Sequence, residues 1–312
     1  MQNQDGLLAD AEVEGITSIQ ASNVEDWENF RDDAIMQQQS SIRAEEAEKI
    51  PFVGDKEPLS SLSSEYQSGS PILLEKIKLL TEEFAAIRRT RGDGNCFFRS
   101  FMFSYLERIL ESQDREEVNR ITGNVENCRT TLQSLGYADF TFEDFFAVNF
   151  VPSYLLTHEV LNLMRFFSFS FSLYSVSSLV VMFFRFVTSG EIRKRSEFFE
   201  PFILGLTNAT VEQFCKSSVE PMGEESDHVH ITALSDALGV PIRVVYLDRS
   251  SCDACGVSVN HHDFIPNPPS GGDLSPAASI ASPTGGSGGS ETIKPFITLL
   301  YRPGHYDILY PK

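Results

Sequence analysis

Apolar residues recur three and four positions apart in several segments of this chain, a spacing that gathers them on one face of an α-helix. The pattern predicts amphipathic helices at residues 72–87, 97–109, 118–135 and 191–206, a buried helix at 179–186, and a short helix that contains Cys215. A capping signal at Thr141 opens a further helix that extends to Phe150. Arg88 and Arg89 follow the first of these segments, and their positive charges suit a helix C-terminus.

Two apolar runs near the C-terminus, residues 296–302 and 305–310, are separated by a Pro-Gly pair that is typical of tight turns. A third run, residues 241–248, has a proline at its start, where the missing N–H does least harm to a strand. Strands of this kind among many helices predict an α+β domain. We expect helices packed on a small, mostly antiparallel sheet.

The composition changes at three places along the chain. Residues 1–50 hold twelve acidic and three basic residues with no sustained apolar period, so residues 1–57 are expected to form an acidic, largely disordered N-terminal region. Residues 58–71 are a serine-rich linker in this interpretation, and residues 266–291, rich in Gly, Ser and Pro, are expected to be a flexible loop. One domain therefore spans residues 58–312.

Overall charge and cysteine usage limit the function and the compartment. The 312 residues include 44 acidic and 25 basic side chains, a net charge of −19, which argues against nucleic-acid binding and suits a basic partner. The five cysteines are scattered, and three of them lie within helical patterns, which favours free thiols in a reducing compartment. No N-terminal signal peptide is recognised, so we expect a cytoplasmic protein that is also present in the nucleus.

A candidate nucleophile lies at the start of the helix predicted at residues 97–109. Gly92, Asp93, Gly94 and Asn95 form a turn, since glycine reaches positive φ freely and Asp and Asn tolerate it. Cys96 therefore occupies the first helical turn, where free N–H groups and the helix dipole favour a thiolate. The alternative is a cysteine that only packs in the core, as we expect for Cys128 and Cys215.

His305 and Asp307 provide a candidate base and a group to orient it. They are two residues apart in the last predicted strand, so both side chains lie on one face. The carboxylate can accept a hydrogen bond from one imidazole nitrogen and leave the other free to take a proton from a thiol. The alternative is a surface pair on an edge strand.

Residues 93–100, D-G-N-C-F-F-R-S, and residues 301–310, Y-R-P-G-H-Y-D-I-L-Y, resemble the two signature motifs of the otubains. These are ovarian-tumour-type (OTU) cysteine proteases, which remove ubiquitin from proteins. Shorter blocks are also similar to otubain sequences, at residues 189–193, 198–200, 219–222 and 225–231. The resemblance spans about residues 65–312, apart from an inserted stretch.

The resemblance implies a papain-like OTU fold with a cleft between the Cys96 helix and the sheet. In that cleft Cys96 would attack a lysine isopeptide bond at the C-terminus of ubiquitin, in chains or conjugates. His305 would first take the thiol proton and later donate it to the leaving lysine amine. Asp307 would fix the tautomer of the His305 imidazole, and Asp93 would shape the loop that receives the oxyanion. No cofactor or metal is implied. Ubiquitin and polyubiquitin chains are the implied partners, and a monomer is expected. Residues 24–49 either form a helix that contacts ubiquitin and ubiquitin-conjugating enzymes, as the resemblance implies, or remain a solvated acidic tail.

Residues 165–176 form an atypical insert, for which we recognise no counterpart in otubain sequences. Nineteen uncharged residues, 166–184, approach the length of a membrane span. Six serines, the flanking arginines and a Phe-Ser alternation of period two oppose that interpretation, so we expect no membrane helix. The composition suits a translated polypyrimidine tract. If the insert disrupts the helical layer, the product is inactive.

Three alternatives remain open from the sequence. Cys252 and Cys255, with His261 and His262, have half the pattern of a zinc site but no second C-x-x-C. His228 and His230 would suit a metal pair, although roles at a helix start and beside the substrate are favoured. The competing function is non-catalytic: a protein that binds ubiquitin and conjugating enzymes and blocks chain assembly by occupancy.

Overall fold

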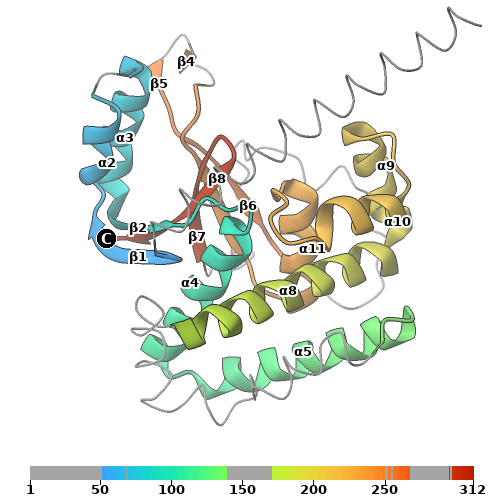
Figure 1. The fold of residues 1–312 in the computed structure, drawn as a ribbon. Helices are drawn as coiled ribbons and strands as arrows, with labels where there is room; N and C mark the ends of the chain where they lie inside the picture. Colours follow the sequence, from blue (N-terminus) through green and yellow to red (C-terminus); the bar gives the residue numbers. More distant parts are fainter. Residues whose placement is uncertain are drawn as a thin grey trace, which may run out of the picture. The chain divides into compact units, whose positions relative to one another are not determined.

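The computed structural model describes residues 51–67, 69–138, 171–249, 252–253, 256–267, 295 and 297–312. Its main sheet has six strands, with the order β1-β2-β8-β7-β3-β6 (Figure 1). In that order the strands are Val53–Pro58, Phe84–Thr90, His305–Pro311, Ile297–Arg302, Ile242–Tyr246 and Asn260–Phe264. Neighbours are antiparallel except β3 and β7, which are parallel. This confirms the predicted α+β fold and its mostly antiparallel sheet.

Helices cover both faces of the sheet. In chain order they are α2 (Ser61–Glu65), α3 (Pro71–Glu83), α4 (Cys96–Ser112), α5 (Arg115–Ser134), α8 (Phe171–Lys194), α9 (Ser196–Leu206), α10 (Val211–Phe214), the π-helix η2 (Cys215–Val219) and α11 (His228–Leu238). The helices predicted at residues 97–109 and 118–135 correspond to α4 and α5. Strands β4 (Cys252–Asp253) and β5 (Gly256–Val257) form a separate two-stranded hairpin.

Two apolar cores lie on opposite faces of the sheet. On one face, Ile77 and Leu80 of α3 pack with Leu300 and Leu309 of the sheet. On the other face, α4 contributes Phe97 and its apolar neighbours to a larger core that also includes residues of α5, α8 and α11. Figure 1 shows α2 and α3 on one side of the sheet, with α4, α8 and α5 on the other. Helix α4 is thus fixed against strands by a buried apolar face.

The prediction of a single helix at residues 72–87 is wrong at its C-terminal end. Helix α3 ends at Glu83, and strand β2 starts at Phe84. Strand β2 pairs with β1 on one side and β8 on the other, so its backbone groups find partners from both ends of the chain. Periodicity within the segment cannot reveal those distant partners, and Arg88 and Arg89 therefore lie in a strand rather than at a helix C-terminus.

The N-terminal boundary of the domain lies earlier than predicted. Strand β1 covers Val53–Pro58, inside the region that was expected to be disordered, and it pairs with β2. The segment predicted as a linker contains α2, whose Leu62 is fully buried. The compact unit therefore begins at Pro51, and the acidic segment before it lies outside the described residues.

Helix α8 is longer than the sequence pattern indicates. It runs from Phe171 to Lys194, and so joins the predicted helix at 179–186 with the first residues of the one at 191–206. Its last turn carries Arg193 and Lys194, which suit a helix C-terminus. Residues 165–170 of the insert, the helix predicted at 141–150 and most of the loop at 266–291 lie outside the described residues. Among the described helices, none is long and apolar enough to cross a membrane.

Candidate active site

The pairing of β2 with β8 brings the two signature segments together. Arg88 of β2 lies opposite Ile308 of β8, and β2 ends at Thr90, immediately before the loop that leads into α4. The β7–β8 hairpin turns at Gly304, which has φ +74, and His305 follows as the first residue of β8. The start of a helix and the start of a strand thus meet at one edge of the sheet.

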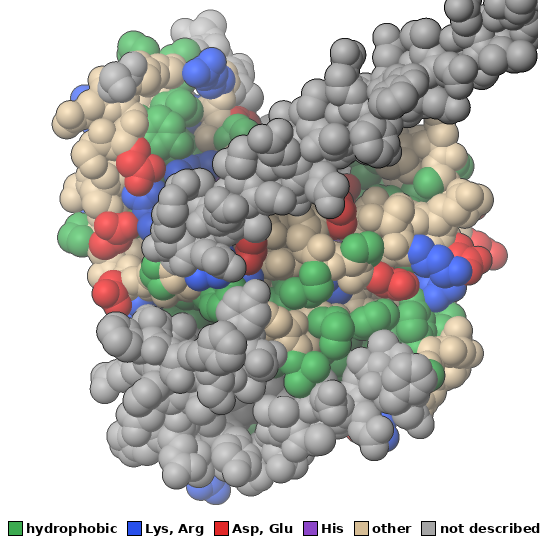
Figure 2. Space-filling model, viewed as in Figure 1, with side chains coloured by type: hydrophobic (Ala, Val, Ile, Leu, Met, Phe, Trp, Pro, Cys, Tyr) green, Lys and Arg blue, Asp and Glu red, His purple; other side chains and the backbone are tan. Residues whose placement is uncertain are grey.

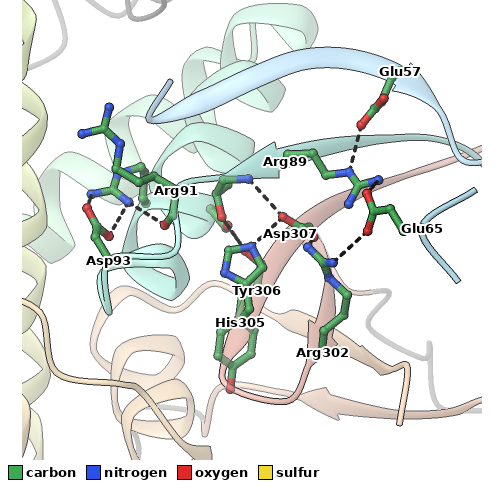
Figure 3. A network of polar contacts seen from close by, with 12 residues as sticks. Glu57, Glu65, Arg89, Arg91, Asp93, Arg302, His305, Tyr306 and Asp307 are labelled. Atoms are coloured by element: carbon green, nitrogen blue, oxygen red, sulfur yellow. Dashed lines mark hydrogen bonds and ion pairs between the residues drawn. The ribbon is translucent and has the colours of Figure 1, made fainter. Parts of the chain in front are cut away.

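Cys96, His305 and Asp307 converge at this edge. The His305 Nε2 atom lies 2.9 Å from Asp307 Oδ1. The opposite side of the ring faces the loop before α4: an ideal Cβ on Gly92 would lie 3.6 Å from His305 Nδ1. The Cys96 side chain lies close enough to His305 to help raise the pKa of the imidazole. Figure 3 shows the imidazole between Asp307 and the loop that carries Asp93.

The electrostatics favour a charged imidazole. Burial alone would lower the pKa of His305, but the hydrogen bonds with Asp307 and Cys96 and their negative charges raise that pKa to about 9. Burial would raise the pKa of the Asp307 carboxyl, but His305, Arg302 and the Thr90 amide outweigh it and hold the pKa below its usual value. At neutral pH the pair is therefore an imidazolium beside a carboxylate.

Asp307 is held rigidly although its side chain is fully buried. Its Oδ1 accepts a hydrogen bond of 3.0 Å from the Thr90 amide, and its Oδ2 accepts one of 2.5 Å from Arg302. Arg302 also donates to Glu65 of α2 at 3.3 Å, within a network that Figure 3 shows on the far side of Asp307. Acidic and basic side chains are mixed on the surface over β1 and α2 (Figure 2). The carboxylate is thus fully hydrogen-bonded and keeps one orientation for His305.

Asp93 lies in the loop before α4 but points away from the His305 ring. Arg99 donates to both of its carboxylate oxygens, at 2.8 and 2.7 Å. Its Oδ1 also accepts a hydrogen bond of 3.1 Å from the Asn95 amide. The guanidinium neutralises the carboxylate, and the Asn95 contact fixes the turn, which supports the predicted role of Asp93 in shaping the loop.

Replacement of Gly94 by any larger residue would cause a steric clash. Its φ is +74, and an ideal Cβ would lie 1.7 Å from the carbonyl oxygen of Gly223. The segment after η2 therefore packs directly on the loop before Cys96. Only glycine satisfies both the backbone conformation and this approach.

The other candidate residues have structural surroundings. Asp227 caps α11 and forms a capping box with His230, whose side chain is buried, so the predicted helix-start role is confirmed. His228 is the first residue of α11, and its Nε2 lies 2.8 Å from the Tyr246 hydroxyl. Cys128 and Cys215 are buried, and burial raises the pKa of their thiols to about 12 and about 11.

The proposed zinc pattern cannot be assembled from the described residues. They contain no group of three or more His, Cys, Asp or Glu side chains placed to hold a metal ion. Cys255 lies outside the described residues, and His261 and His262 lie on strand β6.

Sequence reasoning missed the basic residues that hold the site. Arg99, Arg185 and Arg302 each contact the loop before Cys96 or the Asp307 carboxylate. Arg99 and Arg302 are part of the two signature segments, so their positions were a usable signal. In the sequence, Arg185 stands out only as the charged residue that follows the uncharged residues 166–184.

A thiol at a helix N-terminus, an imidazole on a strand and a buried carboxylate behind it define a papain-like cysteine peptidase. The family model described as Peptidase C65 Otubain matches residues 45–311. The chain belongs to the otubain family, and its fold is the papain-like OTU fold that the sequence resemblance implied.

Relatives and solved structures are similar over almost the full chain. "OVARIAN TUMOR DOMAIN-containing deubiquitinating enzyme 1" of Arabidopsis thaliana is 61% identical over 321 residues, covering 100% of this chain and 96% of that protein. "Ubiquitin thioesterase OTUB1" of Homo sapiens is 39% identical over 281 residues, covering 89% and 90%. The solved structure of h/ceOTUB1 with ubiquitin aldehyde and UBCH5B~Ub has a TM-score of 0.69 and 33% identity, covering 90% of this chain and 98% of that one.

Proposed function

We propose that this protein is a cysteine-type deubiquitinating hydrolase that cleaves isopeptide bonds at the C-terminus of ubiquitin. The observation that carries the proposal is the meeting of Cys96, His305 and Asp307 at one edge of an otubain fold. Relatives named deubiquitinating enzyme and ubiquitin thioesterase support the substrate class.

The mechanism follows from the charges of the three side chains. The Cys96 thiolate attacks the carbonyl carbon of the scissile amide, and the His305 imidazolium donates its proton to the departing lysine amine. Ubiquitin is then held as a thioester. The neutral imidazole takes a proton from water, which attacks the thioester and releases the ubiquitin carboxylate together with the thiol. Asp307 orients the ring and stabilises its charged form throughout.

The oxyanion that forms in both steps needs donors near the sulfur. The Asn95 amide already donates a hydrogen bond to Asp93, so it is engaged within the loop. Cys96 is the first residue of α4, and the first N–H groups of a helix have no partner within the helix. The Cys96 amide and the helix dipole therefore stabilise the oxyanion in this proposal.

Ubiquitin and ubiquitin-conjugating enzymes are the proposed partners. Two of the similar solved structures contain h/ceOTUB1 with ubiquitin aldehyde and either UBCH5B~Ub or UBC13~Ub. These complexes also favour a second function for this chain, in which it binds a charged conjugating enzyme and blocks chain assembly without cleavage. The two functions can coexist in one protein.

The pH dependence of cleavage tests the role assigned to His305. Because its pKa is about 9, the imidazolium is present below that pH and is lost as the pH rises through it. We expect kcat/KM to fall on the alkaline side of about pH 9. In Asp307→Asn this limb moves to lower pH, since the charge that raises the pKa of His305 is removed, and kcat/KM drops by about 100-fold. An unshifted limb in the variant contradicts the role of Asp307.

A panel of di-ubiquitins with defined lysine linkages tests the function itself. The proposal predicts conversion of at least one linkage to free ubiquitin, measured by intact mass. Chain assembly by a conjugating enzyme is followed in parallel with the wild-type protein and with Cys96→Ala. Block of assembly by both proteins without cleavage by either would leave only the non-catalytic function.

A further inference from the structure

The side chain of Arg185, in helix α8, is fully buried against the loop that precedes Cys96. Its Nη2 donates to the Gly94 carbonyl at 3.0 Å and to Asn95 Oδ1 at 2.9 Å, and its Nε donates to the same Oδ1 at 3.2 Å. The peptide between Gly94 and Asn95 is therefore fixed at both ends, because its N–H is held by Asp93. This peptide lies one residue before the peptide that joins Asn95 to the nucleophile.

The same guanidinium also holds the segment that follows the π-helix η2. It donates to the carbonyl of Val219 at 3.0 Å and to that of Glu224 at 2.6 Å. In addition, the Gly223 amide donates to Asn95 Oδ1 at 3.0 Å. Arg185 thus joins two segments that are far apart in the sequence, at the place where Gly223 packs on the loop before the nucleophile.

The charge of Arg185 is not neutralised by the atoms that it binds. In the described part of the chain, its hydrogen bonds end on carbonyl and amide oxygens, which are uncharged. Its guanidinium also lies 4.8 Å from the centre of the Phe98 ring. Burial lowers its pKa to about 10, while Glu224, Asp93 and Cys96 act in the opposite direction. A buried cation without a bound carboxylate is costly, so a role beyond stability is indicated.

We propose that Arg185 is a positioning residue for the nucleophile: it fixes the peptide that aims Cys96, and its positive charge favours the thiolate. This inference rests on the proposed cysteine hydrolase function. Among the described residues, the other charged or titratable groups near Cys96 or this loop include His305, Asp307, Asp93, Arg99, Glu224 and Tyr306. Arg185 differs from these groups because it reaches the loop from α8.

Three variants separate positioning from a structural role. Arg185→Gln removes the charge and most of the donors, and Arg185→Lys keeps the charge but not the planar fork. Arg195→Gln is the matched control, because Arg195 directly follows α8 and is partly buried, but it binds Glu191 and Asp236. For each, we measure the melting temperature, kcat and KM for di-ubiquitin, and the pH profile of Cys96 alkylation by iodoacetamide.

For Arg185→Gln we expect kcat about 100-fold lower with a nearly unchanged KM. The alkylation midpoint should rise by about one pH unit. Arg185→Lys should keep the wild-type alkylation midpoint and still lose about tenfold in kcat. This variant tests the positioning role even if Arg185→Gln does not fold. Arg195→Gln should lower only the melting temperature. Wild-type kcat per folded molecule in both Arg185 variants, or an unshifted profile in Arg185→Gln, would overturn the inference. Alkylation needs no ubiquitin, so it stays informative if the wild type cleaves no ubiquitin chain.

Discussion

Cys96→Ala is expected to abolish cleavage of di-ubiquitin while the protein stays folded and still binds ubiquitin. The sulfur forms the bond to the substrate carbonyl in the proposed mechanism, and no other thiol in the described residues contacts His305. We expect kcat to fall at least about a thousandfold. The free energy of unfolding should change by about 1 kcal/mol or less, since a small buried group is lost. Initial rates, calorimetric melting and ubiquitin binding measure the three effects.

Cys128→Ala is the matched control for this prediction. Cys128 is also buried, but in the core of α5, where burial raises the pKa of its thiol to about 12 and keeps it protonated. This variant should retain wild-type turnover. If Cys96→Ala cleaves like the wild type, or if both variants lose activity equally, Cys96 is not the nucleophile.

Gly94→Ala should have the second largest effect, although it adds only a methyl group. The new Cβ would lie 1.7 Å from the Gly223 carbonyl oxygen, a backbone atom that cannot rotate away. The positive φ adds strain of about 1 kcal/mol. The loop before Cys96 must therefore shift, and we expect a loss of about 3 kcal/mol in unfolding free energy and about 100-fold in kcat. Denaturant unfolding and initial rates give both values.

Gly136→Ala distinguishes the clash from the backbone strain. Gly136 has φ +84, and an added Cβ there meets no atom within 4 Å. This control should cost about 1 kcal/mol in stability and leave kcat unchanged. Similar losses in both variants would show that close packing of Gly223 on the loop does not matter.

The central features of the fold were predictable where the signal is local. The period of apolar residues gave α4 and α5, and the Pro-Gly pair with two apolar runs gave the β7–β8 hairpin. Cys96 at a helix start and His305 two residues from Asp307 were visible for the same reason. Their spatial meeting was expected from the resemblance, and the structure brings them together.

The remaining features depend on partners that are distant in the sequence. Strand β2 exists because β1 and β8 pair with it on either side, whereas its own residues fit a helical period equally well. The buried side chain of Arg185 reaches the catalytic loop from a helix that follows a long uncharged run. Nothing in the local pattern distinguishes it from a flanking arginine on the surface.

The most direct test of the central claim uses ubiquitin with a thiol-reactive group at its C-terminus. The wild-type protein should gain the mass of one ubiquitin, and peptide mapping should place the bond on Cys96. Binding without a covalent adduct, or an adduct on another cysteine, would contradict the account of Cys96, His305 and Asp307 as a catalytic group.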